Sequence, residues 1–181
     1  MKTALLMVDI QNDYFAAGAN PLEDSESAAL NAKRLLEKFR LDNAEIVHIQ
    51  HIAQRTDASF FIPGTVGCNI HQLVQPLGNE KVIIKHFPNS FRDTELFDYL
   101  QSRQISHLVI CGMMTHMCID ATTRAAKDLG FTCTLIADAC ATKELKFDNH
   151  LIKATDVHQS FVAALSYFYA TTKTTEQFLT E

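Results

Sequence analysis

The sequence predicts a single α/β domain in three layers, with helices on both faces of a parallel sheet of five or six strands. Short apolar runs without polar alternation are typical of strands buried on both faces, and amphipathic helical stretches separate these runs. This regular succession favours parallel strands joined by right-handed crossovers. A length of 181 residues suits one domain, residues 1–181, and neither an internal repeat nor a linker divides it.

The elements follow from these patterns in chain order. The expected strands are 3–9, 45–50, 81–85, 107–112 and 132–138. Helical spacing of apolar residues predicts four helices: one from Asp24 or Ser25 through Phe39, one after Thr94, one that ends at Gly130, and one from Val157 to Phe168. Residues 51–80 contain Gly and Pro and have no strong period, so we expect a long excursion over the ligand pocket.

Composition excludes several classes of partner. The formal net charge is −5 and the isoelectric point is about 5.9, so no basic face is expected for nucleic acid or anionic lipid. No segment approaches the roughly 20 apolar residues of a membrane span, and Asp9 interrupts the apolar N-terminus before any cleavage site. The five cysteines form no C-x-x-C pair and indicate reduced thiols. We therefore expect a cytoplasmic protein that acts on a small molecule.

Three reactive side chains fall at one edge of the predicted sheet. Ligands of open parallel sheets bind beyond the carboxyl ends of the strands. Asp9 ends the first expected strand, Lys85 ends the third, and Cys118 follows the fourth at the start of a helix. A strand order of 3-2-1-4-5 places Asp9 beside the loop that leads to Cys118. The side chain of Lys85 must then reach across roughly 10 Å, since strands lie ~4.8 Å apart.

These three residues are an acid, a cation and a nucleophile. A helix N-terminus should stabilise the thiolate of Cys118 and lower the pKa of this thiol below ~8.5. A thiolate and a carboxylate repel each other, so the ammonium of Lys85 is needed between them, and a half-desolvated Asp9 suits a general base. Each residue alone also fits a purely structural role: a small buried side chain, a strand-end lysine or a turn former.

Three sequence blocks carry a family resemblance. The blocks "VDIQNDYF", "KVIIKHFPNSF" and "VICGMMTHMCIDATTRAA" resemble the catalytic blocks of the isochorismatase-like cysteine hydrolases, which include nicotinamidases, N-carbamoylsarcosine amidase and ureidoacrylate hydrolases. The resemblance extends over nearly the whole chain, through "DACAT" and "VHQSFVAALS". It implies a Rossmann-like sheet, a catalytic triad of Asp9, Lys85 and Cys118, and a homo-oligomer, either a dimer or a tetramer. It also implies a cis peptide between Met113 and Met114 that turns the Met114 N–H toward an oxyanion, beside the N–H of Cys118.

The expected activity is hydrolysis of a C–N bond in a small amide, ureide or carbamoyl compound through a thioester, without a cofactor. One alternative is a thiol-based redox or electrophile sensor, with Cys111 or Cys140 as resolving thiol. A second is an isochorismate-type ether hydrolase, although family members with that activity lack the cysteine. A third is a binding module without turnover, which would leave a buried charged cluster unused at a desolvation cost.

The remaining expectations concern metal and substrate contacts. Nicotinamidases of the family carry an Asp-x-His metal motif after the second strand, and "VHIQHIAQ" has no aspartate there. His48 and His51 should point to opposite faces of a strand, and His71 has no obvious partner, so no metal is expected. The candidates for substrate contact, each of which equally fits the core or the rim, are Phe15, Phe60 or Phe61, His86 and His116.

Overall fold

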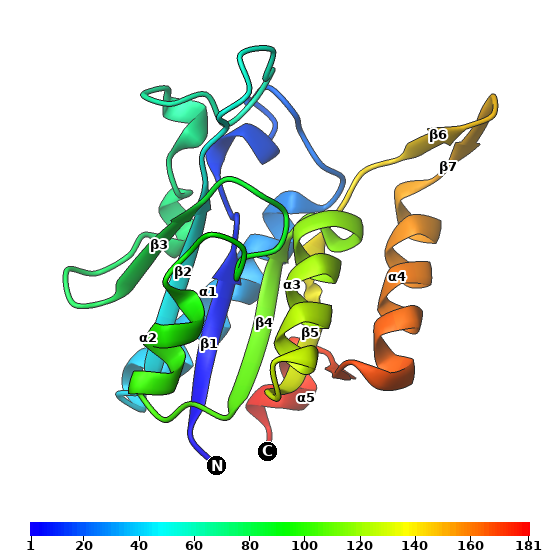
Figure 1. Cartoon of the computed structure of the whole chain (residues 1–181). Coiled ribbons are helices and arrows are strands. Elements are labelled where there is room, and N and C mark those ends of the chain that lie inside the picture. The colour runs from blue at the N-terminus through cyan, green and yellow to red at the C-terminus, as the bar shows by residue number, and fades with distance from the viewer.

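The central sheet has six parallel strands in the order β3-β2-β1-β4-β5-β8, as seen in the computed structural model of residues 1–181 (Figure 1). Five of the strands coincide with the expected apolar runs, and the three-layer α/β prediction is confirmed. The strands are β1 (Thr3–Val8), β2 (Glu45–His51), β3 (Lys81–Lys85), β4 (His107–Met113), β5 (Thr132–Ala141) and β8 (Thr171–Lys173).

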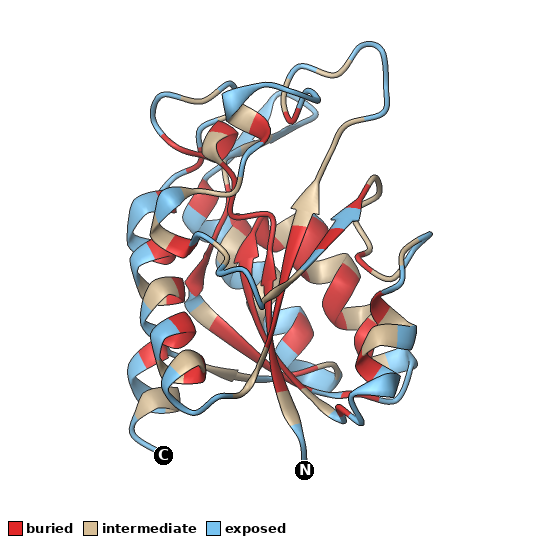
Figure 2. Cartoon of the chain, turned by 90° about the vertical axis from the view of Figure 1, so that its left-hand side faces the viewer, coloured by how far each residue is buried: buried red, intermediate tan, exposed pale blue.

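Helices cover both faces of this sheet. The helices are α1 (Ser25–Leu41), α2 (Leu96–Ser102), α3 (Asp120–Asp128), α4 (Ala154–Phe168) and α5 (Thr175–Leu179). In β1, Leu5 packs in one apolar cluster with α1 and α5, and Leu6 packs in a second cluster with α2, α3 and α4. Successive strand residues point to opposite faces, so both faces of the sheet are buried between helical layers (Figure 2).

Several short elements have no counterpart in the sequence prediction. After β5, strands β6 (Leu145–Phe147) and β7 (His150–Ile152) form an antiparallel hairpin that projects from the body (Figure 1). The strands β6, β7 and β8 have three residues each, which is too short for a hydrophobic period to be recognised. None of the helices combines the length and the apolar composition needed to cross a bilayer.

The loop after β2 closes over the carboxyl edge of the sheet. It contains two 3₁₀ turns, Val66–Cys68 and Gln72–Val74, and it is tied to the segment after β1 by an isolated antiparallel bridge between Gln11 and Ile70. The excursion expected over residues 51–80 therefore lies against the chain that follows Asp9.

Candidate active site

Asp9 and Lys85 meet at the carboxyl edge of the sheet although β2 lies between their strands. Asp9 follows β1 with a left-handed backbone (φ 52°), and its N–H donates to the carbonyl of Ile49 in β2 (3.1 Å). The chain thus turns toward β2, and Lys85 Nζ lies 2.7 Å from Asp9 Oδ2 with both side chains fully buried. Lys85 Nζ also donates to the carbonyl of Pro88 (2.9 Å). This turn closes the gap of two strand spacings that the sequence predicts.

Cys118 joins this pair from the loop after β4. It lies in a π-helical turn (Thr115–Ile119) that leads into α3, and it is 4% exposed. Its Sγ, a carboxylate oxygen of Asp9 and a ring nitrogen of His51 all lie within 4.8 Å of one another. The structure therefore brings all three residues of the expected triad together.

The protonation of the cluster follows from its burial. Burial raises the pKa of the Cys118 thiol, the charge of Asp9 raises it further, and Lys85 only partly opposes them. The expectation that a helix N-terminus lowers the pKa of this thiol is therefore wrong, because the sulfur is shielded from water and its charged form is disfavoured. Burial works against the charge of Lys85, but the charges of Asp9 and Cys118 outweigh it and raise the pKa of Lys85. At neutral pH, Lys85 is therefore an ammonium and Cys118 a neutral thiol.

One oxygen of the Asp9 carboxylate is free to accept a proton. Lys85 Nζ forms an ion pair with Oδ2, but neither Oδ1 nor Oδ2 accepts a well-aligned hydrogen bond and both are buried, so Oδ1 has no partner of any kind. A buried carboxylate oxygen is normally paired, and leaving one unpaired costs free energy. This free oxygen next to a protonated thiol is the arrangement that a general base requires.

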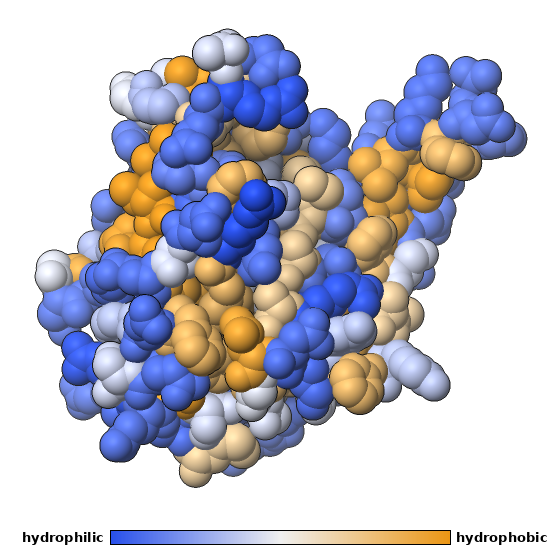
Figure 3. All heavy atoms as spheres, viewed as in Figure 1, coloured by the Kyte–Doolittle hydropathy of each residue, from blue (hydrophilic) through white to orange (hydrophobic).

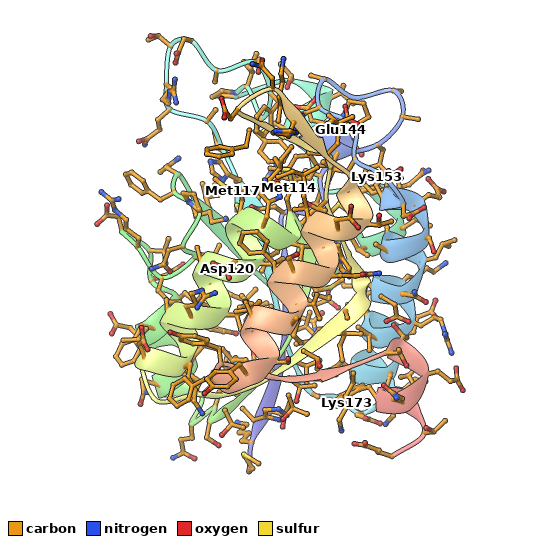
Figure 4. The ribbon with its side chains drawn as sticks, turned by 90° about the vertical axis from the view of Figure 1, so that its right-hand side faces the viewer. Met114, Met117, Asp120, Glu144, Lys153 and Lys173 are labelled. Atoms are coloured by element: carbon orange, nitrogen blue, oxygen red, sulfur yellow. The ribbon has the colours of Figure 1, made fainter.

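The end of β4 supplies a backbone donor beside the cluster. The Met113–Met114 peptide bond is cis, and the N–H of Met114 donates to no acceptor of the chain. Gly112 has φ 129°, and a Cβ there would lie 2.0 Å from the carbonyl oxygen of Val8, so only glycine allows β4 to approach β1 this closely. Figure 4 shows Met114 and Met117 at the carboxyl end of the sheet, where α3 begins.

Residues 3–168 match the family model described as Isochorismatase domain. The chain is a member of the isochorismatase family. It is 51% identical over 99% of both chains to the uncharacterized isochorismatase family protein YddQ of Bacillus subtilis. It also resembles the crystal structure of an isochorismatase hydrolase from Oleispira antarctica, with 45% identity, a TM-score of 0.96, and coverage of 99% and 97% of the two chains. A streptothricin hydrolase of Streptomyces noursei is 31% identical over 90% of this chain and 56% of its own length. Since members of this family are hydrolases, the chain is a hydrolase.

An aromatic group of this isochorismatase-family hydrolase lies beside the triad. The Tyr14 ring packs edge-on against Phe61 (centroids 4.7 Å apart) and lies 5.8 Å from Phe60. Phe61 in turn lies 5.7 Å from the ring of His51. Burial and the charges of Cys118 and Asp9 raise the pKa of Tyr14 well above its ordinary value, so the hydroxyl stays neutral. Phe60 thus belongs to an aromatic group with Tyr14 and Phe61 that reaches His51.

The other expected substrate contacts make different interactions. Phe15 stacks on His71 with 3.7 Å between ring centroids, and His86 Nδ1 lies 2.8 Å from the carbonyl oxygen of Ile52.

His116 lies two residues before Cys118 in sequence, yet its Nδ1 bonds the hydroxyl of Thr142 (2.5 Å) and its ring faces Phe161 of α4. None of these contacts involves a triad residue. His116 and Cys118 stand two residues apart on a helical turn, and side chains at this spacing do not face each other.

Three residues in the first sequence block contribute to the site and were not named from the sequence. The buried amide of Gln11 donates to the carbonyl oxygens of His51 (2.9 Å) and Cys68 (2.7 Å) and accepts the N–H of His51 (2.7 Å). Asp13 Oδ2 accepts the N–H of Phe61 (2.6 Å). With Tyr14 they hold the excursion over the triad. Their signal was present in "VDIQNDYF", where polar residues follow a buried strand directly.

The histidines of β2 occupy separate environments. His48 is buried, and its Nε2 lies 2.9 Å from Glu80 Oε2, which Arg40 also contacts. His51 lies at the triad instead, so the two histidines share no partner. Asp9, His51 and Cys118 lie close enough together to surround a cation, and the ammonium of Lys85 already supplies a positive charge to Asp9.

Proposed function

We propose that this hydrolase uses Cys118 to cleave a C–N bond of a small amide, ureide or carbamoyl compound through a thioester. The observation that carries the proposal is the buried cluster itself: Lys85 paired with one oxygen of Asp9, the other oxygen free, and the Cys118 thiol beside them. The relative named streptothricin hydrolase supports hydrolysis of a small molecule.

Among the substrate-contact candidates, Phe60 packs with Tyr14 and Phe61 near His51 and has the strongest support. Phe15, His86 and His116 contact residues outside the triad and would reach a substrate only from the rim.

In the first half-reaction, Asp9 accepts the thiol proton while the sulfur of Cys118 attacks the carbonyl carbon. The thiol stays protonated at rest because burial raises its pKa, so proton transfer must accompany the attack. Lys85 remains charged throughout and stabilises the negative charge that develops on the sulfur while the proton leaves. The backbone N–H groups of Met114 and Cys118 stabilise the tetrahedral oxyanion, where one donor contributes roughly 3–4 kcal/mol.

In the second half-reaction, the C–N bond breaks and the leaving nitrogen takes the proton from Asp9. A water molecule then attacks the thioester and gives a proton to Asp9, and the sulfur regains that proton as the C–S bond breaks. Every step uses groups of the chain, so the proposal includes no metal or cofactor. The five cysteines are unpaired thiols, which suits the reducing cytoplasm.

The redox alternative finds less support. A sensor thiol requires an accessible thiolate and a resolving thiol, whereas Cys118 is buried with a raised pKa. The candidate resolving thiols Cys111 and Cys140 interact with each other, and burial raises the pKa of both. The ether-hydrolase alternative leaves Cys118 without a role.

The test is an ammonia-release assay across nicotinamide, ureides, carbamoyl amino acids and simple amides. Any compound that is hydrolysed should lose all turnover with Cys118→Ala and nearly all with Cys118→Ser, because a hydroxyl is far less acidic than a thiol. Cys133→Ala is the matched control, since Cys133 is a buried thiol of β5 and should leave turnover intact. Ammonia release by Cys118→Ala at the wild-type rate would refute the proposed nucleophile.

A further inference from the structure

His51 is a largely buried histidine with no hydrogen bond from its ring. It ends β2, and its side chain is 18% exposed, whereas those of Asp9 and Lys85 are 0% exposed. Its Nδ1 lies 3.8 Å from Asp9 Oδ2, and one ring nitrogen lies within 4.8 Å of the Cys118 sulfur. His51 is therefore more exposed to solvent than any of the three triad residues.

The chain fixes the position of His51 firmly. Gln11 bonds both the N–H and the carbonyl of His51, and the imidazole packs near the ring of Phe61. Packing alone would be served by an apolar ring. The ring nitrogens of His51 have no hydrogen-bond partner in the chain, yet they are not among its fully buried unpaired atoms, so a water molecule can reach and bond them.

We propose that His51 positions the water that hydrolyses the thioester on Cys118, an inference that rests on the proposed function. A separation of 3.8 Å between His51 Nδ1 and Asp9 Oδ2 is too long for a hydrogen bond, yet one water can bond both atoms. That water lies within reach of an acyl group on the sulfur. Asp9 takes one water proton as the oxygen attacks, the C–S bond breaks, and the proton passes to the departing sulfur.

The imidazole acts here as a neutral acceptor. Burial lowers the pKa of His51; the charge of Asp9 opposes this effect, and the charges of Lys85 and His86 add to it. A neutral ring has one nitrogen lone pair to accept a water O–H. His51 therefore orients the water, and Asp9 remains the base.

The test separates thioester formation from thioester hydrolysis with p-nitrophenyl acetate, whose nitrophenolate burst reports acylation and whose steady state reports deacylation. His51→Phe keeps the ring packing and removes both nitrogens. We expect an unchanged burst, a steady-state rate lower by about 10²-fold, and an acetylated protein in intact-mass spectra. His51→Asn, which keeps a polar group near the position of Nδ1, should recover part of the rate. His107→Asn, at the opposite edge of the sheet, is the control.

The outcomes distinguish the two proposals. A normal burst and an unchanged steady state in His51→Phe would overturn the role of His51 and leave the nucleophile standing. A burst lost together with the steady state would place His51 in acylation instead and would also overturn this inference. A wild-type burst that persists in Cys118→Ala would refute the proposed function itself.

Apolar side chains also gather on the projecting hairpin and on α4, as Figure 3 shows along this side of the molecule. Phe147 of the hairpin is 76% exposed and Tyr167 of α4 is 93% exposed, and no Asp, Glu, Lys or Arg occurs from Val157 to Thr172. An exposed apolar surface of this kind is typical of a contact with another protein, which agrees with the homo-oligomer that the family resemblance implies.

Discussion

Replacement of Lys85 by methionine should destabilise the protein severely. The ammonium lies 2.7 Å from Asp9 Oδ2, and neither side chain is exposed, so the substitution leaves a buried carboxylate without its cation. Breaking a buried pair in this way costs about 3–5 kcal/mol. At ~2.1 cal/mol/K per residue, a chain of 181 residues has an unfolding entropy near 0.4 kcal/mol/K, so a loss of ~4 kcal/mol lowers Tm by ~10 °C.

The assay is urea unfolding at neutral pH, with calorimetry for Tm. Lys81→Met is the matched control, because Lys81 begins the same strand and pairs with an exposed Glu95, so its loss should cost at most about 1 kcal/mol. Asp9→Asn combined with Lys85→Met should be less destabilised than Lys85→Met alone, since no unpaired charge remains. A Lys85→Met variant as stable as Lys81→Met would refute the buried ion pair.

Three further substitutions test other parts of the structure. Burial works against the charge of Glu80, but hydrogen bonds from Arg40, Leu77 and His48 outweigh it and lower the pKa of Glu80 to about 2. Glu80→Gln should therefore lower the free energy of unfolding by about 2–3 kcal/mol at pH 7. In urea unfolding, this difference between variant and wild type should shrink as the pH falls below the unfolded pKa toward 2. Because burial raises the pKa of Cys118, ultraviolet difference spectra against Cys118→Ala should show no thiolate between pH 6 and 9. Above the unfolded thiol pKa of ~8.5, the free energy of unfolding of wild-type protein should fall more steeply with pH than that of Cys118→Ala. Gly112→Ala would place a Cβ 2.0 Å from the carbonyl of Val8 and should cost more than about 3 kcal/mol in unfolding free energy; a soluble variant of wild-type stability would contradict the close approach of β4 to β1.

The sheet could be predicted because its central strands are apolar on both faces. β4 is buried along almost its whole length, and such a run has few alternatives once helices flank it. The short strand β8 could not be predicted in this way, because its three residues, Thr171–Lys173, contain no apolar run. Only their pairing with β5 identifies them as a strand. The hairpin β6–β7 was missed for the same reason, because its strands are equally short. Its exposed Phe147 also departs from the division into apolar core and polar surface on which the prediction relied.

The triad residues could be chosen because each stands at a strand end, where parallel sheets bind ligands. Their electrostatics could not be predicted, because the burial that raises the pKa of Cys118 comes from an apolar cluster whose members, such as Ile83 and Leu135, lie far from it in sequence. His51 was considered only as a metal ligand, and its position beside Asp9 follows from a left-handed turn that no sequence pattern shows. His116 was chosen for its nearness to Cys118 in sequence, but side chains two residues apart on a helical turn do not face each other, and His116 bonds Thr142 instead.

The most direct test of the central claim is to locate the acyl group during turnover. Wild-type protein quenched in acid while it hydrolyses p-nitrophenyl acetate is digested and mapped by mass spectrometry. The account predicts an acetyl thioester on the peptide that contains Cys118, absent from Cys118→Ala. An acetyl group confined to another cysteine, or turnover without any acylated peptide in wild-type protein and His51→Phe alike, would contradict it.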